Sequence, residues 1–205
     1  AGVVPDDYPL PVAADWPDLL AIVEQKVFPD RQKQKDAIAK KYWWKFLRPR
    51  PELREAVSRV ERVLVAGSQA SARFAFAFLP RGIVYSSNLS VLTLPQNSAF
   101  AVIQARAHEE WTRLTMTTLK DDLVYTTTTC FDPFPFPIGF ETNAALEAAG
   151  REYYEFRAAL MVRKNEGLTK TYNRFRDPEE RSPDILKLRD LHAAMDAAVL
   201  TAYGW

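Results

Sequence analysis

The side chains that most often perform catalysis are scarce in this sequence. The run His108-Glu109-Glu110 begins like the zinc motif His-Glu-x-x-His, but Thr112 occupies the position of the second histidine ligand. His192 is the other histidine of the chain, and Cys130 is its single cysteine, so four-cysteine zinc sites are excluded. Cys130 lies in a threonine run with no base beside it in sequence, which favours packing over nucleophilic catalysis.

Glycine motifs that hold nucleotide cofactors are also missing. The seven glycines form neither a Gly-x-Gly-x-x-Gly cluster nor a P-loop. We therefore predict no catalytic residues, no metal site and no cofactor in this chain. We expect the chain to bind a partner and not to catalyse a reaction.

The first binding candidates are Arg48 and Arg50. They follow Trp43 and Trp44 in a turn that Pro49 stiffens. Guanidinium groups contact phosphate or guanine in a bidentate manner, and a rigid turn lowers the cost of ordering them. The alternative is that both arginines pair with the glutamates of the segment that follows.

Two further polar segments carry residue types that contact nucleic acid. Residues 67–73 are predicted to form a short loop before a strand, and serine, glutamine and arginine are types that read base edges. The alternative is an ordinary hairpin connection. Residues 163–176 hold five basic residues and one acid and are predicted to be a loop suited to phosphate contacts. The candidates in these segments are Ser68, Gln69, Ser71, Arg73, Lys170 and Arg174.

Charge is distributed very unevenly along the chain. The net charge is +1, yet residues 31–62 carry eleven basic residues against four acids, and residues 1–30 carry one against six. A concentrated basic block beside a nearly neutral body is expected of a protein that contacts a polyanion. A solvated amphipathic helix is the alternative.

The elements that must position these residues change type along the chain. Apolar spacing and prolines predict a helix–strand–helix succession: helices over 15–29, 36–46 and 51–57, strands over 63–66, 73–79, 83–85, 89–94 and 125–131, and helices over 98–115, 143–162 and from 183 onward. The predicted fold class is α+β, with a small, mainly antiparallel β-sheet and flanking helices, followed by a helical C-terminal segment. We expect two parts, residues 1–140 and residues 141–205.

The segment from Tyr125 to Pro137 is a strong local signal. Its four threonines favour an extended strand, and three prolines at alternate positions then remove backbone donors and fix φ. The interleaved phenylalanines are apolar and must pack against something. The segment therefore predicts a rigid junction between a strand and the helical tail.

Composition sets the broad class of the protein. With 205 residues, of which 47% are hydrophobic, the chain is predicted to be globular. No apolar run approaches the ~18 residues of a membrane span, and the N-terminus lacks a signal peptide pattern. A lone cysteine favours a reducing, cytoplasmic location. The chain begins with alanine, and we expect it to be a piece of a longer protein.

Two segments in this order, residues 42–54 and 125–137, resemble the target recognition region of MmeI-like (type IIG) restriction–modification enzymes and related large adenine-specific DNA methyltransferases. The first is rich in tryptophan and ends in Arg-Pro-x-x-x-Leu-Arg. Between them lies a His-x-x-Trp element, His108 to Trp111, and residues 165–173 and 191–196 resemble that family's C-terminal helical piece. The resemblance covers most of residues 30–205.

The resemblance implies recognition of a DNA sequence on behalf of a catalytic domain that is not in this chain. The family's Asn-Pro-Pro-Tyr methylation motif and its S-adenosylmethionine-binding glycine motif are absent from the sequence. It implies that S-adenosylmethionine serves the missing domain and that the partners are double-stranded DNA and that methyltransferase domain. Residues 1–140 would be the target recognition domain. Residues 118–123 replace a glycine-rich loop of the family. The alternative is a protein-interaction module that docks on other domains without reading bases.

Overall fold

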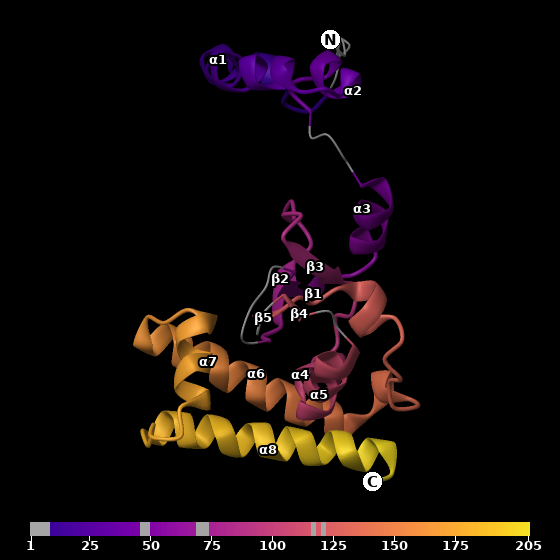
Figure 1. The fold of residues 1–205 in the computed structure, drawn as a ribbon, viewed down its shortest axis with the longest axis vertical. Coiled ribbons are helices and arrows are strands. Elements are labelled where there is room, and N and C mark those ends of the chain that lie inside the picture. The colour runs from indigo at the N-terminus through magenta and orange to yellow at the C-terminus, as the bar shows by residue number, and fades with distance from the viewer. Residues whose placement is uncertain (1–8, 46–49, 69–73, 116–117, 120–121) are drawn as a thin grey trace. The chain divides into compact units, whose positions relative to one another are not determined.

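A computed structural model describes residues 9–45, 50–68, 74–115, 118–119 and 122–205 (Figure 1). The chain divides into two compact units, Ala1–Leu53 and Arg54–Trp205. Helix α3 (Pro51–Ser58) contains the point of division. The side chains of residues 118–119 and 122–123 are not described.

The first unit is helical. A short 3₁₀ turn, η1 (Ala13–Asp15), precedes α1 (Pro17–Lys33), and α2 (Ala37–Lys41) follows. Helix α1 begins at Pro17 as predicted, but it continues through Pro29 to Lys33. Proline removes one helical hydrogen bond, and Pro29 lies on an exposed part of the helix, where water can satisfy the carbonyl left free.

Helix α2 is shorter than the sequence predicted. The carboxylate of Asp36 caps its start by accepting hydrogen bonds from the amides of Ile38 and Ala39. The helix ends at Lys41, and residues 42–44 form a turn. The rings of this turn pack edge to face, with 5.7 Å between the centroids of Trp43 and Trp44. The aromatic contacts therefore hold a turn where helical spacing suggested a continuing helix.

The second unit contains a three-stranded antiparallel sheet. Its strands are β1 (Arg62–Gly67), β2 (Ala77–Pro80) and β3 (Leu89–Leu92), in the order β2-β1-β3. A separate pair, β4 (Thr118–Leu119) and β5 (Asp122–Leu123), is also antiparallel. The predicted α+β class with a small antiparallel sheet is confirmed.

Two strand predictions between β1 and β3 were wrong in extent or existence. Residues 74–76 precede β2 without joining it, and side chains of two helices, not a neighbouring strand, bond the amide and the carbonyl of Phe76. Residues 83–85 form no strand. They belong to the connection between β2 and β3, where Ile83 and Val84 are exposed and have no packed face.

The helix predicted over residues 98–115 is interrupted. It consists of α4 (Asn97–Gln104) and α5 (Arg106–Thr115), with Ala105 in an extended conformation between them. The carboxylate of Asp196 accepts a hydrogen bond from the amide of Arg106 at 2.8 Å, which satisfies the start of α5. A residue 90 positions away thus supports the break.

The threonine run is not a strand. Thr127–Phe131 forms a π-helical turn, η2, in which the amide of Asp132 donates to the carbonyl of Thr127 at 2.8 Å. Cys130 is buried in this turn, in agreement with the packing role predicted for it. Its carbonyl accepts a hydrogen bond from the indole of Trp111 at 3.0 Å. A tertiary contact therefore overrides the β propensity of threonine.

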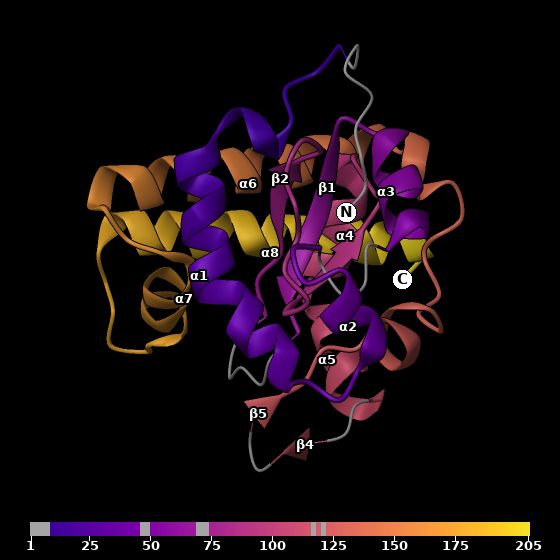
Figure 2. The same ribbon diagram turned by 90° about the horizontal axis from the view of Figure 1, so that it is seen from above.

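Three helices follow the proline-rich exit and a 3₁₀ turn, η3 (Phe140–Thr142). They are α6 (Ala144–Lys164), α7 (Leu168–Arg176) and α8 (Pro183–Tyr203). Helices α6 and α8 run antiparallel, side by side, in both ribbon views (Figures 1 and 2). The predicted loop over residues 163–176 was wrong for most of its length, because α7 occupies it and buries Thr171 and Tyr172.

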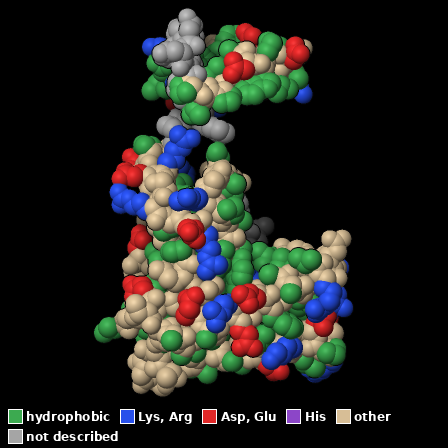
Figure 3. Space-filling view, turned by 180° about the vertical axis from the view of Figure 1, so that it is seen from behind, with side chains coloured by type: hydrophobic (Ala, Val, Ile, Leu, Met, Phe, Trp, Pro, Cys, Tyr) green, Lys and Arg blue, Asp and Glu red, His purple; other side chains and the backbone are tan. Residues whose placement is uncertain are grey.

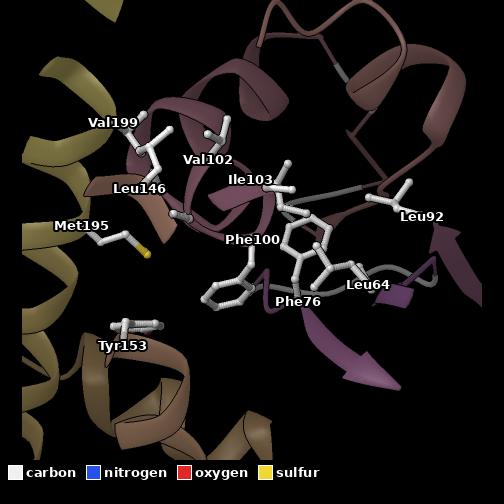
Figure 4. Packing of buried hydrophobic residues seen from close by; sticks show 14 of the residues in the cluster. Leu64, Phe76, Leu92, Phe100, Val102, Ile103, Leu146, Tyr153, Met195 and Val199 are labelled. Atoms are coloured by element: carbon white, nitrogen blue, oxygen red, sulfur yellow. The ribbon is translucent and has the colours of Figure 1, made fainter. Parts of the chain in front are cut away.

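The core of the second unit joins the sheet to these helices. Phe100 of the fully buried helix α4 lies between Leu64 of β1 and Phe76, which precedes β2, on one side and the helical residues Tyr153 and Met195 on the other (Figure 4). The C-terminal helices thus share one hydrophobic core with the sheet. The division at residues 140 and 141 stays a prediction.

Candidate nucleic-acid interface

Arg50 lies directly before α3 and is exposed. Its φ is +47°, an uncommon conformation for a residue other than glycine. In the described residues no carboxylate is within ion-pairing distance of Arg50. Its guanidinium is therefore available to a ligand, whereas Arg48 falls outside the residues that the structure describes.

The first unit carries a basic and aromatic surface within the basic block of residues 31–62. Lys40, Lys41 and Lys45 are exposed beside Tyr42 and Trp44, and we call these five residues the lysine–aromatic surface. The ammonium groups of Lys41 and Lys45 lie 5.3 and 5.1 Å from the centre of the Tyr42 ring. Two cations held on one aromatic ring form a compact positive surface.

Helix α1 fixes the backbone of this surface. The side chains of Gln32 and Arg31 donate hydrogen bonds to the carbonyls of Lys40 and Lys45, at 3.2 and 3.3 Å respectively. Asp36, the acid within residues 31–45, is engaged in capping α2. Among the described residues, no acid therefore forms an ion pair with Lys40, Lys41 or Lys45.

Ser68 lies at one end of the sheet. Its amide donates a hydrogen bond to the carbonyl of Asn88 at 2.9 Å, directly before β3. The register pairs Gly67 with Leu89 and Val65 with Ala77, so Phe76 enters the sheet at the same end where Ser68 leaves it. The other candidates of this segment, Gln69, Ser71 and Arg73, lie outside the described residues.

Lys170 and Arg174 lie on helix α7, not on a loop. The guanidinium of Arg174 bonds Glu180 at 2.9 Å, Glu166 at 3.1 Å and the hydroxyl of Ser182 at 2.9 Å. Hydrogen bonding from the amide of Ser182 and from Arg174 lowers the pKa of the Glu180 carboxyl to about 2. Lys170 pairs with Glu166 at 3.4 Å, but its side chain is 69% exposed. The geometry thus leaves Lys170 accessible and engages Arg174 in holding α7 to the start of α8.

Replacing Arg174 by glutamine is expected to lower the Tm by about 2–4 °C, the range that a loss of roughly one hydrogen-bonded ion pair produces in a domain of this size. The matched variant Lys170→Gln, on the same helix and with the same charge change, should leave the Tm within a degree or so. Thermal unfolding followed by circular dichroism measures both. Equal Tm values for the two variants would contradict the structural role of Arg174.

Arginines of the second unit are mostly paired or structural. Arg59 bonds Glu55, Arg81 donates to the carbonyl of Ser58 at 3.4 Å, and the guanidinium of Arg62 lies 3.7 Å from the centre of the Phe78 ring. Basic and acidic side chains alternate over the face of this unit seen in Figure 3. The concentrated positive charge predicted for residues 31–62 therefore belongs chiefly to the lysine–aromatic surface and Arg50.

The His-x-x-Trp element contacts the proline-rich exit directly. The Nε2 atom of His108 lies 3.0 Å from the hydroxyl of Tyr125, and the rings of His108 and Phe134 are 4.3 Å apart. Trp111, one turn later, bonds the carbonyl of Cys130 and packs on Phe134. Burial lowers the pKa of His108 to about 3, so its imidazole is neutral. The two motifs form one structural clasp, and the rigid junction is packed as predicted.

Two cavities of the second unit are lined mainly by helical residues and not by the sheet. One, of about 300 Å³, is lined by residues of α5, α7 and α8, among them Glu109, which Arg113 and Arg176 hold. A second, of about 370 Å³, borders Leu200 and Trp205.

Among the described residues no group of three or more His, Cys, Asp or Glu side chains is placed to hold a metal ion. Nor does any described helix have the length and apolarity needed to cross a membrane.

Comparison with known proteins identifies a family and a related fold. The family described as "MmeI, target recognition domain" matches residues 25–138, which is more than half of the chain. Among solved structures, the chain is similar to the type IIL restriction–modification enzyme MmeI determined in complex with DNA, with a TM-score of 0.59 and 18% sequence identity. That match covers 91% of this chain and 24% of MmeI, so this chain spans about a quarter of that enzyme. No curated protein sequence matched.

Proposed function

The chain belongs to the family of MmeI target recognition domains, and from this premise we propose that it reads a DNA sequence for a restriction–modification enzyme. The methyltransferase that would use the sequence, and the S-adenosylmethionine that it would consume, belong to other parts of that enzyme. In such a system the catalytic domain takes the target adenine out of the duplex, while the recognition module selects the site. The relative of known structure is a type IIL enzyme, and the type IIG subclass stays a prediction.

The observation that carries the proposal is the family match over residues 25–138. It contains the lysine–aromatic surface, Arg50 and the end of the sheet at Ser68. Helix α7, with Lys170 and Arg174, lies outside that match. We therefore place the main DNA contacts on the first three of these features.

We propose a division of labour between the two units. Lysine ammonium groups are compact, strongly hydrated charges that suit phosphate oxygens, so the lysine–aromatic surface would bind the DNA backbone. Ser68, at the end of the sheet, would contact base edges through its hydroxyl. Gln69, Ser71 and Arg73 follow it in the sequence and offer amide, hydroxyl and guanidinium groups that can bond bases specifically. Arg50, whose exposed side chain has no ion-pair partner in the described residues, would add a phosphate contact. A cytoplasmic location, where DNA is accessible in a bacterial cell, is part of this proposal.

Selection from a library of random duplexes tests the proposal, because it requires no assumption about which sequence is recognised. The chain is incubated with the library, bound duplexes are recovered over several rounds, and the pool is sequenced. A target recognition domain should enrich one short sequence motif. Enrichment of DNA without any motif would support non-specific backbone binding only and would contradict sequence reading.

Salt dependence tests the role assigned to the lysine–aromatic surface. Lys41→Gln and Lys45→Gln should each reduce the slope of log Kd against log salt by about 0.9, the change expected for one lost phosphate contact. The selected motif should stay the same. Lys187→Gln, an exposed lysine on α8, makes the same charge change and should leave the slope unaltered. Identical slopes for all three variants would exclude this surface from the interface.

An uncovered apolar face supports a second role, docking on another domain. Leu19, Ile22 and Val23 lie on one face of α1 at helical spacing and are all at least 40% exposed, and Ala39 is the one buried hydrophobic residue among the described residues of the first unit. Apolar faces of this kind mark interaction surfaces. The two roles are compatible, because a recognition module must also contact its catalytic domain. Docking alone predicts no salt-dependent binding of duplex DNA.

A further inference from the structure

Arg157, in the middle of α6, is a buried charge without an acidic partner. The residue is 2% exposed, and in the described part of the chain no ion pair joins its guanidinium to a carboxylate. Removing a charge from water costs several kcal/mol unless hydrogen bonds and polarisable groups replace the lost hydration. The surroundings of Arg157 must therefore supply that replacement.

Neutral groups from four parts of the fold surround the guanidinium. Its Nη2 atom donates to the carbonyl of Phe76 at 2.6 Å, and its Nη1 atom donates to the hydroxyl of Tyr172 at 2.8 Å. The Phe100 and Tyr154 rings lie 5.2 and 5.1 Å from the guanidinium carbon. Arg157 thus connects α6 to α7 and to the segment that leads into β2.

Side chains of α4 and α6 bond three backbone groups of that segment and of the start of β2. The amide of Phe76 donates to the side-chain oxygen of Gln104 at 3.0 Å, while its carbonyl accepts from Arg157. The amide of Phe78 donates to the hydroxyl of Tyr154 at 3.0 Å. Strand β2 is at an edge of the sheet, where its outer backbone groups would otherwise be unpaired. Helices α4 and α6 therefore take the place of a neighbouring strand.

This segment lies at the end of the sheet that carries Ser68. Phe76 enters the sheet where Ser68 leaves it, and Asn88 is bonded to Ser68 at the same end. This is the end to which the proposed base contacts were assigned. A shift of Phe76 would move the sheet edge beside those contacts, and small displacements of a recognition group are costly.

We propose that Arg157 is a positioning residue for DNA recognition. It fixes residues 76–78 against the helical bundle and thereby sets the placement of the base-reading end of the sheet. This inference rests on the proposed function. It assigns the C-terminal helices a part in discriminating between sequences, while phosphate binding by the first unit does not depend on them.

Three variants separate positioning from plain stability. Arg157→Lys keeps the charge but loses the fork that reaches Phe76 and Tyr172 together. Tyr154→Phe removes only the hydroxyl that accepts from Phe78. Tyr172→Phe is the matched control, since it removes one buried hydroxyl that contacts Arg157 and none that contacts residues 76–78. If Arg157→Lys does not fold, Tyr154→Phe carries the test.

The readout is the ratio of Kd values for a scrambled duplex and for the duplex that the unaltered chain selects, measured well below each variant's Tm. We expect Arg157→Lys and Tyr154→Phe to reduce this ratio about tenfold, by weakening the selected duplex alone. Tyr172→Phe should keep the ratio whatever its Tm. A ratio unchanged in both positioning variants, or a ratio that follows Tm across all three, would overturn the inference.

A second measurement separates this inference from the proposed function. In Tyr154→Phe the backbone amide of Phe78 should exchange with solvent faster, because its acceptor is gone. Unchanged exchange would refute the contact itself, with or without DNA. Failure of the unaltered chain to select any motif would instead refute the proposed function, and Arg157 would then have no recognition to position.

Discussion

Gly150→Ala is expected to destabilise the second unit by about 3 kcal/mol, the upper part of the range for overpacking, and to lower its Tm by about 10 °C. A Cβ atom at this position would lie 2.1 Å from the carbonyl oxygen of Asn97 and 2.9 Å from its carbonyl carbon. Both are backbone atoms of α4, so no side chain can rotate away. Helices α4 and α6 share the most extensive contact between any two described elements, and they would have to separate.

The sign of this effect is what makes it diagnostic. In an exposed helix, glycine to alanine stabilises by about 1 kcal/mol because alanine has the higher helix propensity. The control Ala148→Gly, on the exposed side of the same helix, should cost about that amount and no more. Thermal and denaturant unfolding of both variants gives the comparison. A Gly150→Ala variant at least as stable as the unaltered chain would show that α6 does not approach α4 as closely as the structure has it.

Local signals predicted the parts of the fold that local interactions decide. Asn143 accepts from the amides of Ala145 and Leu146 at the start of α6, and Pro183 opens α8, both as their residue types indicate. The four-residue apolar core of β1 is buried on both faces, which a short apolar run favours. The two helix starts depend on contacts within a few residues, whereas β1 was identified from its own apolar run although the strands that pair with it are distant in sequence.

Distant partners decided the elements that the sequence did not predict. The break at Ala105 depends on Asp196, and the turn at Thr127–Phe131 depends on Trp111. Neither partner is visible to a pattern read over a short window. Helix α7 is different, because Leu168, Tyr172 and Phe175 have helical spacing that could have identified it.

The sequence predicted the type of ligand that the candidate site would bind, but only some of the residues that form or support it. The basic block and its aromatic residues indicated a polyanion-binding surface, and the family match supports that interpretation. Arg157 was missed because an arginine within a helix is ordinarily solvated. A signal existed in Tyr153 and Tyr154, which precede it by one turn and supply rings around the guanidinium.

His108 is expected to make the free energy of unfolding fall as the pH drops from 7 towards 4.5. Below the ordinary histidine pKa, this one residue should cost about 1.4 kcal/mol per pH unit. Burial lowers the pKa of its imidazole from 6.5 to about 3. In the unfolded chain the imidazole would take up a proton near pH 6.5, whereas in the folded chain it stays neutral. The stabilisation is therefore complete above pH 6.5 and is lost progressively as the pH falls towards 3.

The surroundings of His108 explain why the folded protein resists protonation. Its Nε2 atom faces the hydroxyl of Tyr125, whose own pKa burial raises far above neutrality. The rings of Phe76 and Phe134 cover the imidazole, and its Nδ1 atom has no hydrogen-bond partner among the described residues. Nor does any carboxylate in that part of the chain contact the ring to stabilise a positive charge. Protonation would therefore place an uncompensated charge at the centre of the clasp.

The free energy of unfolding of the unaltered chain and of His108→Gln, measured from pH 7.5 to 4.5, tests this account. Glutamine can still bond Tyr125 but does not titrate, so its variant should be less stable at pH 7.5 through poorer packing. It should also lose about 2–3 kcal/mol less than the unaltered chain on acidification, two pH units below the ordinary histidine pKa. The difference between the two curves isolates His108, because every other titrating group is common to both chains. Parallel curves would mean that His108 takes up its proton in the folded state as easily as in the unfolded state, and the clasp would then have to admit water.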